Sequence, residues 1–145
     1  SVVRILEDFL GFSRVDGAFL VGAGSLGSAL LQDKGLSAFG LQIEAAFDTD
    51  KTKIGTKVND IEIFHIDQFR AMAAERKVVI GIITVPAEHA QNVADLMVAW
   101  GIKAIWNFTP ARIKVPTHIV VQNTTIYMNL AILFNKLYND KGEKK

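Results

Sequence analysis

The strongest constraint on the fold is a glycine pattern, Gly22-x-Gly24-x-x-Gly27, which directly follows an apolar stretch at residues 18–21. An apolar strand that runs into these glycines and then into an amphipathic helix is the dinucleotide-binding fingerprint. The first glycine makes a tight turn, the second lets the backbone approach a pyrophosphate, and the third lets the helix pack close to the strand. The first N–H groups of the helix face the phosphates. The sequence therefore predicts a phosphate-binding turn made of Gly22, Ala23, Gly24, Ser25, Leu26 and Gly27.

An acidic residue follows where this fingerprint expects one. The second predicted strand, residues 41–47, ends at Asp48, which lies about 20 residues past the last glycine, and an aspartate there accepts hydrogen bonds from the adenosine ribose. Asp is also a common turn residue, so Asp48 and Asp50 have the alternative role of capping a loop. Two negative groups 4 Å apart repel by about 4 kcal/mol at an effective dielectric near 20. Asp48 therefore favours NAD(H) over NADP(H), whereas Lys53 beside the ribose would favour a 2′-phosphate.

Length and composition favour a single domain that is stable without disulfide bonds. A chain of 145 residues is one domain by size. The absence of cysteine excludes disulfides, thiolate metal sites and cysteine nucleophiles, and fits a reducing cytoplasm. A net charge of +1 gives no global signal for nucleic acid binding. We expect no secretory signal and no membrane span, because no apolar run approaches about 20 residues. The three histidines lack ligand spacing, so no metal site is expected.

Strand and helix patterns alternate along the rest of the chain. We expect an asparagine-aspartate turn at Asn59, a helix N-cap at Asp67 and Pro86 in the first turn of a helix. The predicted fold is a single doubly wound Rossmann-type α/β domain with a mostly parallel sheet. The apolar patterns place strands at 18–21, 41–47, 61–64, 78–84, 103–106 and 118–121, and helices at 2–12, 25–33, 67–75, 87–100 and 124–138.

Two further segments follow strands at the carboxyl edge of the predicted sheet, where ligands of doubly wound folds bind. They are Thr84-Val85-Pro86 and Asn107-Phe108-Thr109-Pro110. We expect them to line the pocket of a nicotinamide ring, with Phe108 and Tyr127 as candidate walls. The last helix is apolar nearly all round, as expected of a helix buried by its own domain or by a partner.

Four motifs in this order together resemble the Rex redox-sensing transcriptional repressors. They are the run from Val21 to Leu30, the Phe47-Asp48-x-Asp50 segment with Lys53-Ile54-Gly55, the Thr84-Val85-Pro86 segment, and the run from Gly101 to Pro110. The resemblance implies a bacterial repressor that binds NADH or NAD+ in this domain and leaves its operator when NADH rises. It also implies a homodimer that exchanges the C-terminal helix, and an N-terminal winged-helix domain that this sequence lacks, through which alone operator DNA would be bound.

On this interpretation residues 1–16 are a linker helix stub, 17–122 an NAD(H)-binding Rossmann domain, and 123–145 a dimerisation helix and tail. No catalytic residue is expected. The predicted cofactor-binding residues are Gly22, Ala23, Gly24, Ser25, Leu26, Gly27, Asp48, Asp50, Lys53, Thr84, Val85, Pro86, Asn107 and Phe108. Two alternatives stay open. An NAD-dependent oxidoreductase would need a proton donor, for which only His89 lies near the predicted crevice. The coenzyme A-binding domain of acyl-CoA ligases has a similar fold, although Asp48 would disfavour a ribose that carries a 3′-phosphate.

Overall fold

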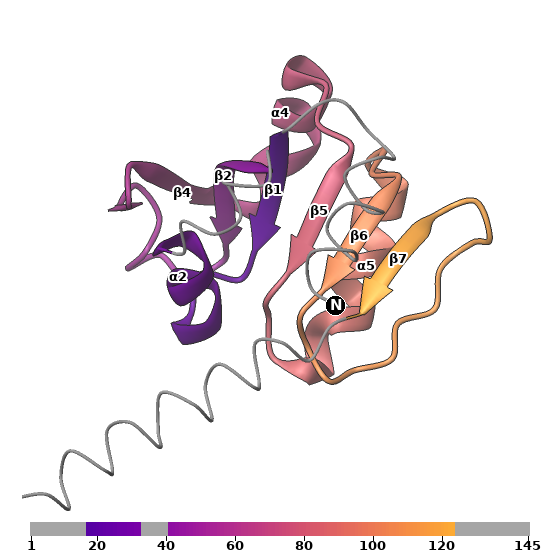
Figure 1. The fold of residues 1–145 in the computed structure, drawn as a ribbon. Coiled ribbons are helices and arrows are strands. Elements are labelled where there is room, and N and C mark those ends of the chain that lie inside the picture. Colours follow the sequence, from indigo (N-terminus) through magenta and orange to yellow (C-terminus); the bar gives the residue numbers. More distant parts are fainter. Residues whose placement is uncertain (1–16, 33–40, 124–145) are drawn as a thin grey trace, which may run out of the picture.

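The structure is a computed structural model that describes residues 17–32 and 41–123 (Figure 1). The strands within these ranges are β1 (Gly17–Val21), β2 (Gln42–Asp48), β3 (Lys57–Val58), β4 (Ile61–His65), β5 (Ile80–Ile83), β6 (Ala104–Asn107) and β7 (Val120–Asn123). The helices are α2 (Ser25–Gln32), the 3-10 helix η1 (Ile66–Gln68), α4 (Phe69–Arg76) and α5 (Ala87–Ala99).

The described strands form one sheet in the order β3-β4-β2-β1-β5-β6-β7. The pairs from β4 to β7 are parallel, and only β3 runs antiparallel to its neighbour. The chain winds outward from β1 through β2 and β4, returns to the other side of β1, and continues through β5, β6 and β7. This order confirms the predicted doubly wound α/β fold. It also creates a switch point between β1 and β5, where a crevice opens at the carboxyl ends of the strands.

The residues of β1 alternate between two hydrophobic cores, one on each face of the sheet. Ala18 and Leu20 pack in the core beneath α2, whereas Phe19 and Val21 pack in the core beneath α4 and α5. Figure 1 shows α2 and α5 on opposite sides of the sheet. Because side chains alternate along a strand, a strand covered on both faces must be apolar throughout, as β1 is.

A tight turn joins β3 to β4. Asn59 and Asp60 both have left-handed backbone angles, with φ of 52° and 67°, which is the signature of a two-residue type I′ hairpin. The predicted turn is therefore confirmed. The antiparallel strand before it, Lys57–Val58, was not predicted, because two residues are too few to show an alternating pattern.

The prediction that Asp67 caps a helix is wrong. The chain enters η1 directly from β4, so the capping position falls on His65. The His65 Nδ1 atom accepts a hydrogen bond from the backbone N–H of Asp67 at 3.0 Å, while the Asp67 side chain is 86% exposed. Histidine is not one of the usual N-cap residues, whereas aspartate is, and for this reason the sequence pattern predicted Asp67 as the cap.

Several boundaries also differ from the predicted ones. The strand predicted at 118–121 lies at Val120–Asn123, and the one predicted at 103–106 lies at Ala104–Asn107. The strand predicted at 78–84 spans only Ile80–Ile83, because the N–H of Val78 bonds to Ala73 O at the end of α4. Pro86 occupies the N-cap of α5 rather than its first turn. The predicted helices at 2–12 and 124–138, the helix end after residue 32 and Tyr127 lie outside the described residues. Within the described ranges, none of the helices has the length and apolar character needed to cross a membrane.

Candidate functional site

A cavity of about 690 Å³ lies at the carboxyl ends of the strands that flank the switch point. Its walls come from the segments that follow β1, β2, β4, β5 and β6, and from one side of α5. The lining residues are Val21, Gly22, Gly24, Ser25, Leu26, Asp48, Thr49, Asp50, Lys53, Ile66, Thr84, Val85, Pro86, Ala87, His89, Asn92, Val93, Leu96, Thr109 and Pro110. Ten of the fourteen predicted site residues are among them, so the structure brings the separate motifs together around one space.

The three glycines of the turn differ in what a side chain would meet. Gly22 has φ of 106°, and a Cβ there would lie 2.7 Å from the backbone nitrogen of Val85. A Cβ on Gly27 would overlap the carbonyl oxygen of Gly22. A Cβ on Gly24 would have the Nζ of Lys53, at 4.0 Å, as its nearest neighbour outside the adjoining residues. Gly22 and Gly27 are therefore required by the fold, whereas Gly24 keeps open the space at the start of α2.

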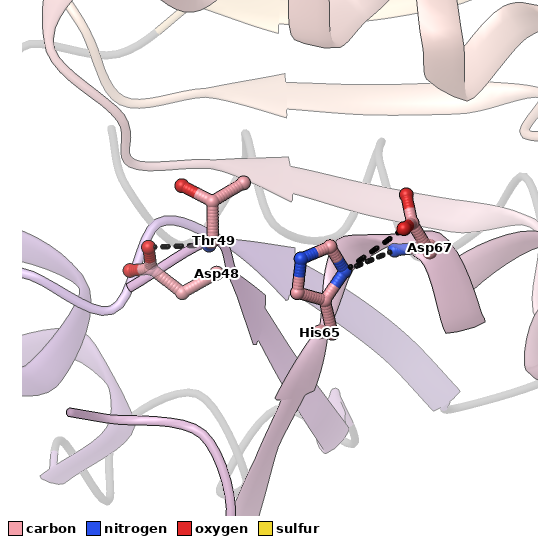
Figure 2. Close-up of polar contacts among 4 residues, drawn as sticks. All are labelled: Asp48, Thr49, His65 and Asp67. Carbon is pink, nitrogen blue, oxygen red and sulfur yellow. Dashed lines mark hydrogen bonds and ion pairs between the residues drawn. The ribbon is translucent and has the colours of Figure 1, made fainter. Parts of the chain in front are cut away.

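Asp48 connects the end of β2 to this turn. Its Oδ2 accepts a hydrogen bond from the N–H of Ala23 at 2.9 Å. Its Oδ1 accepts bonds from the N–H groups of Thr49 at 2.7 Å and Asp50 at 3.0 Å. Figure 2 shows the bond to Thr49. Three backbone donors therefore hold this half-buried carboxylate in place at the wall of the cavity.

The loop after Asp48 is held by its own side chains. Asp50 Oδ1 accepts bonds from the hydroxyl and the N–H of Thr52, at 2.7 and 2.9 Å. These bonds, with a smaller contribution from the charge of Lys53, hold the pKa of the Asp50 carboxyl below its usual value. Lys53 Nζ donates to the carbonyl oxygen of Ala23 at 2.9 Å. The loop thus brings a cation over the glycine turn.

Thr84 holds the two strands of the switch point together at the point where they part. Its buried hydroxyl lies 2.7 Å from the carbonyl oxygen of Gly22 and 3.0 Å from that of Val21, and its N–H bonds to the same Val21 oxygen at 3.0 Å. The glycine turn is thereby fixed against the segment that follows β5.

Four predicted site residues do not line the cavity. Ala23 and Gly27 are buried beneath the turn that they form. Asn107 is 0% exposed. The Phe108 ring lies in the core beneath α2, 4.8 Å from the ring of Trp106. The next two residues, Thr109 and Pro110, form the wall that had been assigned to Phe108.

Two histidines lie near this edge of the sheet, and they differ in position. His65 is the β4 partner of Asp48 in the parallel register, but Figure 2 shows its ring directed to Asp67, where Nδ1 lies 3.3 Å from the carboxylate. His89 lines the cavity from the first turn of α5, as predicted, and its exposed ring lies 3.8 Å from Glu88. Among the described residues no group of histidines and carboxylates is arranged to hold a metal ion.

Apart from His89, the sequence analysis did not identify the α5 side of the cavity. This wall is formed by residues at helical spacing: His89, Asn92, Val93 and Leu96. Such spacing is visible in the sequence, but it equally describes the face that a helix packs on its own sheet, and Val93 belongs to the core as well.

Comparisons with known proteins agree with this geometry. Residues 16–111 match the family described as the CoA binding domain. The redox-sensing transcriptional repressor Rex of Bacteroides fragilis is 57% identical over 137 residues, which cover 94% of this chain and 62% of that protein. The repressor of the same name from Bacteroides thetaiotaomicron is 56% identical with the same coverage. The chain thus spans less than two thirds of the length of these curated relatives.

Solved structures similar to this one include three of RSP, a Rex-family repressor. The first has a TM-score of 0.76 at 30% identity and covers 95% of this chain and 66% of its own. RSP in complex with β-NADH gives 0.73 at 28% identity, with coverage of 99% and 71%. RSP in complex with β-NAD+ and operator DNA gives 0.72 at 31% identity, with coverage of 88% and 59%.

Proposed function

Because this chain belongs to the Rex family of redox-sensing transcriptional repressors, we propose that residues 17–122 are the NAD(H)-binding sensor domain of such a repressor. The domain responds to the cellular ratio of NADH to NAD+. The observation that carries the proposal is the cavity at the switch point, which joins the glycine turn, the carboxylate of Asp48 and the segments after β5 and β6 in one space.

The adenosine half of the dinucleotide is bound at Asp48. The carboxylate accepts from the ribose hydroxyls while it stays anchored to the N–H of Ala23. The open space at Gly24 takes the diphosphate, opposite the start of α2, and Lys53 supplies a positive charge beside it. Asp50 keeps the loop closed through Thr52. A 2′-phosphate would meet Asp48, so NAD(H) is preferred to NADP(H).

The nicotinamide half is bound at the other end of the cavity, where Thr84, Val85 and Pro86 face Thr109 and Pro110. The lining residues on this side carry no carboxylate. A cationic nicotinamide ring loses more hydration free energy than a neutral dihydronicotinamide ring when it is buried against such a surface. The cavity therefore favours NADH. Asn107 and Phe108 support this wall from behind, and Ala23 and Gly27 support the diphosphate turn in the same way.

The domain binds its cofactor without turning it over. His89 is the one histidine among the described lining residues, and its exposed ring lies beside Glu88, so the described part of the wall offers no buried histidine or carboxyl group as a general acid. Curated relatives are named as repressors. We infer that the full repressor is cytoplasmic and a homodimer that pairs through residues 123–145. Operator DNA, which RSP binds in one solved complex, is contacted through an N-terminal domain outside the present sequence.

Parallel calorimetric titrations with NADH, NAD+, NADPH and coenzyme A test this function, with the mass in solution measured by light scattering. We expect NADH to bind at least about tenfold more tightly than NAD+, equivalent to about 1.4 kcal/mol, and NADPH and coenzyme A to bind weakly. The absorbance of NADH should stay constant, and the mass should be that of a dimer. If coenzyme A binds more tightly than NADH, the cavity is a coenzyme A site, as the name of the matching family suggests, and the proposed function is wrong.

A further inference from the structure

Asn107, at the end of β6, uses its whole hydrogen-bonding capacity inside the protein. Its Oδ1 accepts from the N–H of Thr109 at 3.0 Å and from the Thr109 hydroxyl at 2.8 Å. Its Nδ2 donates to Ala111 O at 2.8 Å and to Asn123 Oδ1 at 3.0 Å. A side-chain amide has two acceptor sites and two donors, so all four are satisfied in a side chain that is 0% exposed.

The two backbone partners leave the amide only one orientation. A flip would put its NH2 group against the N–H of Thr109 and its oxygen against the Ala111 carbonyl, which would break both of these bonds. The Thr109 hydroxyl extends the network, because it accepts from the N–H of Ala111 at 3.2 Å while it donates to Asn107. The segment 107–111 is thus a closed ring of hydrogen bonds, and this ring sets the position of Thr109 and Pro110 at the cavity wall.

The fourth bond of the amide leaves this ring and crosses to β7. Asn107 and Asn123 are register partners in the parallel pair of β6 and β7, and Asn123 is the last residue of β7. Asn123 is exposed and does not line the cavity. The Asn107 amide is therefore a hydrogen-bonded connection between Thr109 at the cavity wall and Asn123 at the end of β7.

We propose that Asn107 is a positioning residue that ties the nicotinamide wall at Thr109 and Pro110 to the C-terminal end of β7, so that a ring bound at this wall is sensed at Asn123. The proposal rests on the function proposed above, and it adds the residue through which the state of the cavity passes to the chain beyond β7. Because the amide is buried and all four of its hydrogen bonds are made, a movement of the wall must either break one of these bonds or move their partners.

The test compares Asn123→Ala with the parent chain for two ligands, NADH and ADP-ribose, which lacks the nicotinamide. Loss of the Asn107–Asn123 bond loosens the wall, and the ring must then order it on binding. We expect affinity for NADH to fall about fivefold, the size of one net hydrogen bond, and affinity for ADP-ribose to stay unchanged. Val120→Ala, on the same strand and partly exposed, is the matched control and should change neither affinity. In the double variant with Asn107→Ala, the Asn123 substitution should have no further effect.

A second measurement uses the unaltered sequence, so it does not depend on the variants folding. The side-chain amide resonance of Asn123 should shift when NADH is added and should not shift with ADP-ribose. Equal losses for the two ligands, additive effects of the two asparagine substitutions, or a resonance that ignores NADH would overturn the proposal. If the parent chain binds ADP-ribose and NADH equally weakly, the proposed function itself fails, and this outcome is distinct from a loss confined to Asn123.

Discussion

Alanine at Gly24 and alanine at Gly27 are expected to damage different properties of this domain. Gly24→Ala should leave the free energy of unfolding within about 1 kcal/mol of the parent, because its Cβ meets nothing closer than Lys53 Nζ at 4.0 Å. Its affinity for NADH should fall by about 100-fold, because the methyl group occupies the space proposed for the diphosphate and costs one or two charge-assisted hydrogen bonds. Gly27→Ala should lower the free energy of unfolding by about 4 kcal/mol or more, since its Cβ overlaps the carbonyl oxygen of Gly22.

Urea unfolding measures the first property and calorimetry with NADH the second. Gly101→Ala is the matched control, because Gly101 has φ of 94° but open space around its Cα, and it lies at the end of α5 away from the cavity. The backbone strain alone should cost about 1–3 kcal/mol there, with NADH affinity unchanged. If Gly24→Ala binds NADH with the affinity of the parent, the diphosphate does not bind at the glycine turn. Stability equal to the parent in Gly27→Ala would contradict the packing of α2 against β1.

Much of the fold was predictable because most of its strands are long enough for their apolar pattern to be recognised in the sequence. The continuous apolar run of β1, its three glycines and the acid at the end of β2 identify a doubly wound unit. The features that sequence analysis missed are short or depend on tertiary contacts. Two residues of β3 show no period, and the His65 cap is recognisable only once β4 is seen to enter η1 directly.

The same division holds within the candidate site. Asp48 and Lys53 were predicted from position in the chain, and both line the cavity. Phe108 was assigned to the wall, although the alternation of β6 points it to the side of the sheet that holds Trp106, and both rings are in one core. The role of Asn107 could not be read from the sequence, because two of its partners, Ala111 and Asn123, meet it only through the folding of the segment after β6.

Asp48→Ala is expected to lower NADH affinity by about 100-fold, since the ribose loses a hydrogen bond to a charged group worth about 1.5–3 kcal/mol. The glycine turn also loses its anchor at the N–H of Ala23. Affinity for NADPH should fall less, or rise, because the repulsion between the carboxylate and a 2′-phosphate disappears. The ratio of the two affinities is therefore the decisive quantity, and calorimetry with both ligands measures it.

Two variants separate the charge of Asp48 from its contacts. Asp48→Asn keeps the shape and one accepting oxygen but removes the charge, so it should relax discrimination against NADPH with a smaller loss of NADH affinity than alanine causes. Asp67→Ala removes a carboxylate that is 86% exposed and outside the cavity lining, and it should leave both affinities unchanged. If Asp48→Ala binds NADH and NADPH as the parent does, the carboxylate serves only to cap the loop at Thr49 and Asp50, and preference for NAD(H) must arise elsewhere in the cavity.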